Sequence, residues 1–321
     1  MRRIKKCTVF LLLLCLLLNL AGCAAAQKPL RGALVLKTVT EVAEFWGTLL
    51  SGVEKAAEEY GVELKVLTSP REIDIDKQIE LIRQVTADKP DVMILSAADY
   101  DRCAEATEEA IAAGIGVVAI DTDVNAAGRA CFVGSNSYEI GLEMGRAMAS
   151  YLPEGGKVAV IQHMLTTTTG IERTRGVLDA LNEAGNIEIL GSFCCDNSTE
   201  QAQTITTELL SADPEIRGFV CTNEVCNVGA ANALVELGMG GRVYVVGCDN
   251  SQRQIQFLEQ NIIQAIVTQR PFNMGYVAVQ QAVRVANGEQ TDDFVEVSCV
   301  LITRENMYTQ ENQKLLFPVL R

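Results

Sequence analysis

Short runs of apolar residues alternate with amphipathic stretches along the chain, at intervals of roughly 25–30 residues. In the first half, the runs expected to form strands are Ala33–Leu36, Val62–Leu67, Val92–Leu95 and Val117–Ile120. The stretches with helical spacing of apolar positions are Phe45–Tyr60, Asp76–Ala87 and Asp101–Ala113. Strands that are apolar throughout are typical of parallel sheets covered on both faces. The pattern therefore predicts repeated β–α units.

The same alternation restarts in the second half of the chain. The expected strands are Lys157–Ile161, Ile187–Gly191, Gly218–Cys221 and Val243–Val246. The expected helices are Thr169–Asn182, Thr199–Ser211, Val225–Leu237 and Gln252–Gln260. Two successive sets of units favour an α/β fold with two doubly wound lobes. A closed eight-stranded barrel is the main alternative, and the spacing alone leaves it open, although few strand ends carry the catalytic set that such a barrel presents.

The N-terminal segment has a charged start, an apolar run and a cysteine. Residues 1–6 carry four basic side chains, and Val9–Leu18 is almost entirely apolar. This run is too short to span a bilayer stably and is typical of a secretory signal. It ends in Leu20–Cys23, which resembles the lipobox of bacterial lipoproteins. We expect residues 1–22 to be removed, and a lipid on Cys23, with residues 23–29 as a tether, to hold the protein on the outer face of the membrane. The alternative is ordinary cleavage near residues 24–26, which would remove Cys23.

The composition indicates a globular and acidic protein. The remaining ~290 residues exceed the usual size of a single core, which agrees with two lobes. Removal of the signal would leave 23 basic residues against 41 acidic ones, a net charge of −18. A surface of this charge repels phosphate backbones, so we expect no nucleic-acid partner.

The cysteines suggest neither a metal site nor an obvious set of disulfides. Eleven are present, and eight would remain after loss of Cys7 and Cys15 and lipidation of Cys23. Most of the eight lie in apolar surroundings, where cysteine behaves as a small buried hydrophobe, so we favour unpaired thiols over disulfides. Their spacing does not match a zinc site, and His163, the single histidine, has no cysteine nearby.

Polar residues gather directly after the predicted strands. In open parallel sheets, ligands bind beyond the carboxyl ends of the strands. Two aromatic residues, Phe45 and Trp46, open the first helix. The polar residues at the other strand ends are Asp121, Asp123, Asn223, Glu224, Asp249, Asn250, Gln269 and Arg270.

These residue types suit a sugar. Carboxylates accept hydrogen bonds, arginine donates through a fork, and Asn and Gln do both, so together they can saturate adjacent hydroxyls. An aromatic face can cover the apolar C–H side of a sugar ring. A ligand without one of the hydroxyls would leave a buried polar group unmatched, which makes such a site selective.

Catalysis has little support in the sequence. There is no nucleophile elbow, Walker loop or dinucleotide-binding glycine motif in a suitable place. His163 lacks the neighbours of a general base, and we interpret it as structural. The pair Asp121 and Asp123 could serve a glycosidase, but their setting suits ligand binding equally well. We expect a protein that is not an enzyme and that needs no cofactor.

Several spaced motifs resemble the type I periplasmic sugar-binding proteins, especially the ribose-binding branch. The resemblance runs from about Leu30 to Met307. The motifs that carry it are Ile120–Asp121, Arg173–Gly176, Leu209–Pro214, Val246–Asp249 and Gln269–Gly275. This resemblance implies two Rossmann-like lobes joined by a three-segment hinge, with the ligand between them. Residues 30–134 and 269–295 would form the N-terminal lobe, and residues 135–268 and 296–321 the C-terminal lobe.

The resemblance also implies which side chains surround the ligand. The matching positions are Phe45, Trp46, Asp121, Arg173, Asn223, Asp249 and Gln269. Asp121 would accept from sugar hydroxyls, Arg173 would donate to sugar oxygens, and the two aromatic residues would flank the ring. Other interpretations stay open, because Arg173 could pair within its own helix, Trp46 could pack in the core, and Asp249 could cap the helix that begins at Gln252.

Three departures from the family pattern leave the identity of the ligand open. Residues 40–44 replace a polar–Asn–Pro turn before the aromatic pair. Thr122 stands where ribose-binding proteins carry an arginine, and Asn197 stands where they place a third aromatic residue. A different pentose, a hexose, a polyol or another hydroxylated metabolite therefore remains possible.

The resemblance implies a monomeric substrate-binding lipoprotein that delivers its ligand to the permease of an ABC importer. A sensory module that presents its closed lobes to a membrane kinase or chemoreceptor has the same features. A carbohydrate-active hydrolase is a third hypothesis. A sugar-responsive repressor is a fourth, but the chain has an export signal and lacks DNA-binding helices.

Overall fold

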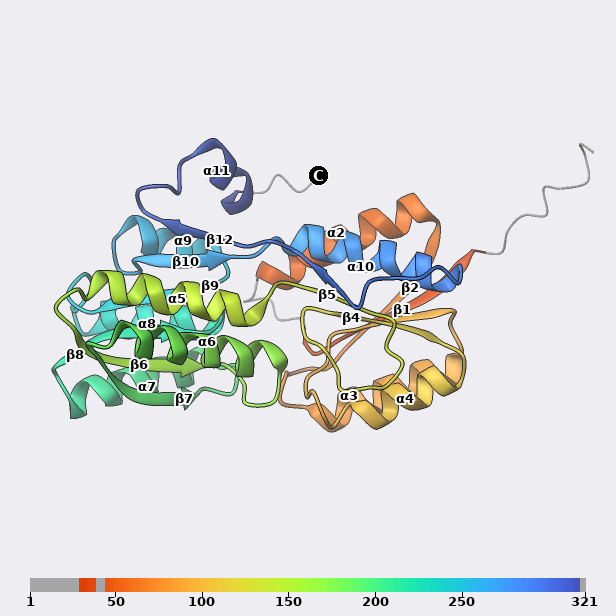
Figure 1. The fold of residues 1–321 in the computed structure, drawn as a ribbon, viewed down its shortest axis with the longest axis horizontal. Helices are drawn as coiled ribbons and strands as arrows, with labels where there is room; N and C mark the ends of the chain where they lie inside the picture. The colour runs from red at the N-terminus through yellow and green to blue at the C-terminus, as the bar shows by residue number, and fades with distance from the viewer. Residues whose placement is uncertain (1–28, 39–43, 318–321) are drawn as a thin grey trace, which may run out of the picture.

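The computed structural model describes residues 29–38 and 44–317. The predicted signal segment and Cys23 lie outside these residues. Figure 1 shows two lobes side by side along the long axis of the molecule, each with its own sheet. Two separate six-stranded sheets rule out the closed barrel. The prediction of two doubly wound lobes is confirmed.

The N-terminal lobe is a parallel sheet with helices on both faces. Its strand order is β11-β5-β4-β3-β1-β2. The strands are β1 (Leu30–Leu36), β2 (Val62–Thr68), β3 (Val92–Leu95), β4 (Gly116–Ile120), β5 (Cys131–Gly134) and β11 (Phe294–Glu296). The helices are α2 (Glu44–Tyr60), α3 (Ile75–Asp88), α4 (Ala104–Ala112) and α10 (Pro271–Ala286). Helices α2 and α10 bury their apolar sides on one face and α3 and α4 on the other, which gives two core clusters (Figure 1).

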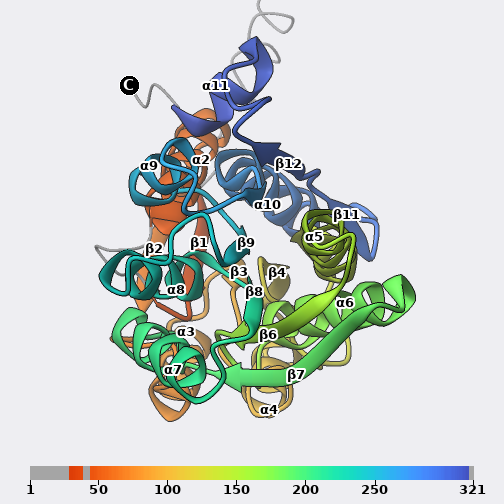
Figure 2. The same ribbon diagram turned by 90° about the vertical axis from the view of Figure 1, so that its left-hand side faces the viewer.

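The C-terminal lobe repeats this arrangement with the strand order β12-β10-β9-β8-β6-β7. The strands are β6 (Gly156–Gln162), β7 (Ile187–Cys194), β8 (Ile216–Cys221), β9 (Tyr244–Cys248), β10 (Ala265–Thr268) and the antiparallel β12 (Val300–Thr303). The helices are α5 (Ser137–Tyr151), α6 (Thr168–Ala184), α7 (Thr199–Ala212), α8 (Glu224–Glu236), α9 (Gln252–Glu259) and α11 (Gln310–Leu316). Figure 2 shows α7, α8 and α9 on one side of the sheet and α5 and α6 on the other.

The chain passes between the lobes at three places. The connections run from β5 to α5, from β10 to α10 and from β11 to β12 (Figure 1). All three lie on the same side of the cleft between the sheets, which is the arrangement expected of a hinge. The three-segment hinge implied by the sequence is confirmed.

Two glycines bring α5 and α6 into close contact. A Cβ on Gly176 of α6 would lie 2.2 Å from the Tyr138 carbonyl oxygen, and one on Gly141 of α5 would lie 2.2 Å from the Arg173 carbonyl oxygen. Only glycine permits this approach of the two backbones. The contact fixes the turn of α6 that carries Arg173.

The eight cysteines of the described residues are all free thiols, in agreement with the interpretation of the sequence. Cys195 and Cys226 are buried, with their Sγ atoms 3.5 Å apart. No group of three or more metal-binding side chains occurs within the part of the chain that the structure describes. Among the same residues, no helix has the length and apolar character needed to cross a membrane.

Candidate ligand-binding site between the lobes

Two aspartates occupy equivalent places at the strand ends of the two sheets. Asp121 follows β4 and Asp249 follows β9, and both have left-handed backbones, with φ of 63° and 69°. Each backbone N–H donates to the next strand, from Asp121 to Val133 O at 3.0 Å and from Asp249 to Val267 O at 2.9 Å. Such strained residues persist where the surrounding structure holds them, often at functional sites. The fold thus turns one carboxylate from each lobe into the same space.

That space is a narrow polar cavity between the lobes. All seven residues predicted from the sequence line it. Of the residues that the structure describes, those that line it are Lys37, Phe45, Trp46, Glu72, Asp121, His163, Thr169, Arg173, Asn197, Asn223, Glu224, Val225, Asp249 and Gln269. Its volume of about 40 Å³ has room for only a few water molecules. A larger guest therefore requires the lobes to separate or the lining side chains to move.

Hydrogen bonds across the cleft hold the lobes together in this structure. Asn197 Nδ2 of the C-terminal lobe donates to Glu72 Oε2 of the N-terminal lobe at 2.8 Å. At the rim, Thr166 Oγ1 donates to Ala98 O at 3.0 Å. The Tyr100 backbone N–H donates back to Thr166 O at 2.9 Å. The structure is a closed state.

The N-terminal wall of the cavity is built around a buried ammonium group. Lys37 Nζ lies 2.9 Å from Glu72 Oε1, 3.3 Å from Asp121 Oδ2 and 5.7 Å from the centre of the Trp46 ring. Burial alone would lower the pKa of Lys37, but the two carboxylates outweigh it and raise the pKa above its usual value. Lys37 therefore carries its charge and partly neutralises the two acidic residues.

The C-terminal wall is built around a buried guanidinium group. Arg173 Nη1 donates to Thr222 O at 2.9 Å and lies 3.9 Å from Asp249 Oδ2, while Arg173 Nε is buried and has no partner among the described residues. Asp249 Oδ1 accepts from Gln269 Nε2 at 2.6 Å. An unpaired buried donor is costly unless a ligand satisfies it. Arg173 pairs outside its own helix, so the interpretation of a pair within the helix is wrong.

A chain of amides joins the two walls. Asn223 Nδ2 donates to Asn197 Oδ1 at 2.9 Å, and Asn197 continues to Glu72. Asn223 also caps α8, because its Oδ1 accepts from the Cys226 N–H. The helix that begins at Gln252 is capped instead by Ser251, so the alternative role of Asp249 as its cap is wrong.

His163 lies in the cavity wall as a neutral, hydrogen-bonded ring. Its Nδ1 is 2.8 Å from Thr222 Oγ1, and its Nε2 is 3.2 Å from Thr169 Oγ1. Burial lowers the pKa of His163 well below its usual value, and the charges of Lys37 and Arg173 lower it further. This residue orients its threonine neighbours and presents an uncharged polar edge.

The aromatic pair stands at the N-terminal side of the cavity. The rings of Phe45 and Trp46 meet edge to face, with centres 5.2 Å apart. Trp46 is 5% exposed and belongs to the core cluster of the N-terminal lobe. It therefore both packs in the core and lines the cavity.

Half of the lining residues were not selected from the sequence. They are Lys37, Glu72, His163, Thr169, Asn197, Glu224 and Val225. Glu224 was among the polar residues found after predicted strands, although it was not one of the seven expected ligand contacts. The same criterion would have found Lys37, which directly follows the first predicted strand. His163 also follows a strand, since β6 ends at Gln162. The other four lie in loops or first helical turns, where the sequence gives no comparable signal.

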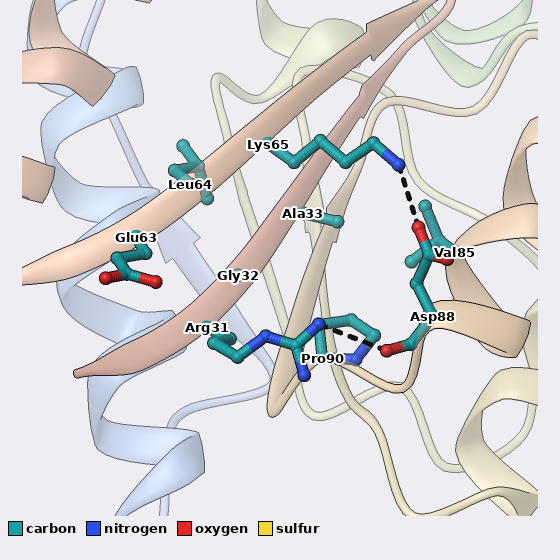
Figure 3. A pocket seen from close by; sticks show the side chains of 9 residues that line it. All are labelled: Arg31, Gly32, Ala33, Glu63, Leu64, Lys65, Val85, Asp88 and Pro90. Carbon is teal, nitrogen blue, oxygen red and sulfur yellow. Dashed lines mark hydrogen bonds and ion pairs between the residues drawn. The ribbon is translucent and has the colours of Figure 1, made fainter. Parts of the chain in front are cut away.

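A larger depression lies at the opposite end of the N-terminal sheet, and it is a poor candidate for a site. It has a volume of about 360 Å³ and is lined by β1, β2 and the end of α3 (Figure 3). Both of its basic side chains have partners, since Lys65 Nζ lies 2.7 Å from Asp88 Oδ2 and Arg31 donates to the carbonyl oxygens of Asp88 and Lys89. The cavity between the lobes, by contrast, contains buried polar atoms that lack partners.

The comparisons with known proteins agree with this geometry. The family model described as a periplasmic binding protein domain matches residues 33–290. The chain belongs to the periplasmic binding protein family. The family resemblance drawn from the sequence is confirmed, and the chain is a binding protein and not an enzyme.

Relatives within this family have names that refer to sugars. The D-allose-binding periplasmic protein of Escherichia coli strain K12 is 26% identical over 90% of this chain and 96% of its own length. A solved solute-binding protein of Actinobacillus succinogenes with bound D-allose is 27% identical, with a TM-score of 0.80, over 87% of this chain and 98% of that one. A solute-binding protein of Agrobacterium radiobacter in complex with D-arabinose has a TM-score of 0.87 and 23% identity, covers 91% and 100% of the two chains, and supports the fold alone.

Proposed function

We propose that this protein is an extracytoplasmic substrate-binding lipoprotein that captures a small sugar between its lobes and delivers it to an ABC importer. The observation that carries the proposal is the convergence of polar side chains from both lobes on one cavity, where some buried groups have no partner within residues 29–38 and 44–317. Arg173 Nε and Glu224 Oε2 are two such groups. A guest with several hydroxyls would supply both donors and acceptors to them.

The ligand class follows from the chemistry of the walls. Two carboxylates face each other across the cavity, and Arg173, Asn223 and Gln269 bring donors to it. Such groups match adjacent hydroxyls, while Phe45 and Trp46 offer apolar surface to C–H groups. The names of the relatives refer to D-allose and D-ribose. We infer that the ligand is a monosaccharide of this kind.

Lys37 and Glu72 extend the site beyond the residues chosen from the sequence. The ammonium group of Lys37 lies between Glu72 and Asp121 and above the Trp46 ring. In that place it would donate to a ligand oxygen. A donor at Lys37 would compensate for Thr122, which stands where ribose-binding proteins carry an arginine and which here bonds to Ser96 and to the carbonyl oxygen of Ala97.

Ligand capture would work by closure about the hinge. We propose that residues 30–134 with 269–295 move as one lobe, and residues 135–268 with 296–321 as the other. A ligand that contacts both walls binds the closed state better than the open one, so it shifts the population toward closure. A permease that recognises the closed pair of lobes would then receive only loaded protein.

A screen of pure sugars tests this function. We expect D-allose, D-ribose or a related aldose to raise the melting temperature of the purified protein, because a ligand that binds only the folded state stabilises it by mass action. Uronic acids should have less effect, because Glu72, Asp121 and Asp249 already place three carboxyl groups around the cavity. If no pentose, hexose, polyol or nucleoside changes the melting temperature, the proposal fails.

The membrane tether has its own test. We propose that Cys23 is lipidated, because small residues precede it at the end of the apolar run. Replacement of Cys23 by serine should move the expressed protein from the membrane fraction to the soluble exported fraction. Replacement of Cys15, inside the apolar run, serves as the control and should leave the distribution unchanged. An unaltered membrane fraction for Cys23→Ser would refute lipidation.

A further inference from the structure

Glu224 is a buried carboxyl group whose protonation state decides whether it offers the ligand a hydrogen-bond donor or only acceptors. It is the first residue of α8, follows the cap residue Asn223, and is 3% exposed. It lines the cavity, and its Oε2 atom is buried and has no hydrogen-bond partner among the described residues. A buried carboxylate needs compensating donors or a cation, because its desolvation is expensive. Glu224 could therefore stay ionised in the closed cleft only if nearby donors or a cation compensated its charge.

The neighbours of Glu224 make its negative charge unfavourable. Its own N–H donates to Asp249 Oδ2 at 3.2 Å, which places a second carboxylate beside it. Glu44 of α2 adds a third acidic group from the opposite lobe, while the Ser251 hydroxyl and the backbone N–H of Glu44 favour the charged form without outweighing burial and the two acidic neighbours. Arg173 Nη1 lies 3.9 Å from the same Oδ2 atom of Asp249, and no Lys or Arg of the described residues makes a salt bridge with Glu224.

We propose that Glu224 enters the closed cleft as a neutral carboxylic acid whose O–H donates to the ligand, so that ligand capture takes up one proton. In the open protein the group is solvated and ionised. On closure it takes a proton from the solvent, and the hydroxyl hydrogen of the acid then points to a ligand oxygen. This inference rests on the proposed function and adds to it a donor that the carboxylate form would lack.

The direction of the pH dependence follows from the pKa values. Burial raises the pKa of Glu224 to about 8, with further contributions from Asp249 and Glu44. A solvated glutamate has a pKa near 4.3. At a pH between these two values, Glu224 is protonated in the closed state and ionised in the open state. Affinity is highest at low pH, falls as the pH rises toward about 8, and changes no further above it.

Calorimetry measures the proton directly. We would titrate D-allose and D-ribose into the full protein at pH 7.5, in phosphate and in Tris, whose heats of ionisation differ. At this pH His163 is neutral whether it is buried or solvated, so it contributes little to the measured proton uptake. We expect the difference between buffers to report an uptake of about one-half to one proton per ligand, and the affinity to fall up to about tenfold per unit from pH 6.5 to 8.

A matched pair of variants assigns the proton to this residue. Glu224→Gln keeps the shape and supplies a permanent N–H donor, so it should bind without proton uptake and with an affinity that does not change over this pH range. Glu236→Gln, at the exposed end of the same helix, should behave like the wild type. The wild-type measurement stands by itself if Glu224→Gln fails to fold.

The outcomes separate the inference from the function. Sugar binding without proton uptake, or equal uptake in Glu224→Gln and wild type, overturns the role of Glu224 and leaves the sugar-binding function intact. Failure of the wild type to bind any sugar in either buffer overturns the proposed function, and the inference falls with it.

Discussion

Replacement of Asp121 by asparagine is expected to weaken sugar binding by about a hundredfold or more while the protein stays folded. The carboxylate is 6% exposed and lines the cavity. Its replacement removes an acceptor for a sugar hydroxyl, and water cannot take the place of that acceptor in the closed cleft. Asparagine tolerates the left-handed φ of 63° at this position better than alanine does. Titration calorimetry with the best sugar from the screen would measure the loss.

Asp123→Asn is the control for this prediction. Asp123 lies two residues further along the same strand end, but it pairs with Arg129 at 2.8 Å and does not line the cavity. We expect it to change the affinity less than about threefold, which is below 1 kcal/mol. Equal losses in the two variants would show that Asp121 acts through local structure. Normal binding by Asp121→Asn would remove it from the site.

Replacement of Lys37 by methionine is expected to lower the free energy of unfolding by about 3–5 kcal/mol, because it strands two buried carboxylates without their cation. Glu72 and Asp121 both lie within 3.3 Å of the ammonium group, and all three side chains are at most 6% exposed. Urea unfolding of the ligand-free protein would measure this loss. The double variant Lys37→Met with Glu72→Gln should recover part of the stability, because it removes one of the stranded charges.

The double variant separates charge from packing. A loss of less than about 1 kcal/mol in Lys37→Met would show that the carboxylates become protonated or hydrated without cost, and would contradict the account of the N-terminal wall. A full loss with no recovery in the double variant would point to packing of the lysine stem against Trp46. Lys55→Met, in an exposed pair with Glu58, is the control and should change stability by less than about 0.5 kcal/mol.

Hydrophobic periodicity predicted the long elements of the fold well. Runs such as Val92–Leu95 became strands whose residues are all buried, and each predicted helix formed with ends shifted by only a few residues. No prediction covered α5, α10, α11 or the short strands β5, β11 and β12. β11 has three residues and only partial burial, so it carries no periodic signal of its own. It pairs with β5 only because the chain returns from the other lobe.

The site was predictable where it depends on strand ends. Asp121, Asp249 and Gln269 directly follow strands and Asn223 lies two residues after β8, and the parallel order of the strands brings such positions to one edge. Glu72 was missed, because it lies in the turn after β2, and only the folded chain shows that it meets Lys37 and Asn197. From the sequence, Asn197 was interpreted only as the absence of a third aromatic residue. In the structure its side chain links the two walls through hydrogen bonds to Asn223 and Glu72.

The charges of the cavity suggest why its walls need the ligand. Lys37 pairs with two carboxylates, and Arg173 lies 3.9 Å from Asp249, while its Nε has no partner in the part of the chain that the structure describes. Neither wall is internally complete, so the closed cleft without a guest retains costly unsatisfied groups. A hydroxyl oxygen of the sugar beside Arg173 would give Nε the partner that it lacks among the described residues, and would favour closure only when a sugar is present.

Trp46 provides the most direct test of a sugar site between the lobes, since it is the only tryptophan of the chain and lines the cavity. Its fluorescence should change in a saturable way during titration with the sugar that raises the melting temperature, with the same dissociation constant as calorimetry gives. In Asp121→Asn the midpoint should move to much higher sugar concentration. A sugar that stabilises the protein but leaves Trp46 fluorescence unchanged at saturation would place the binding site elsewhere and contradict the account.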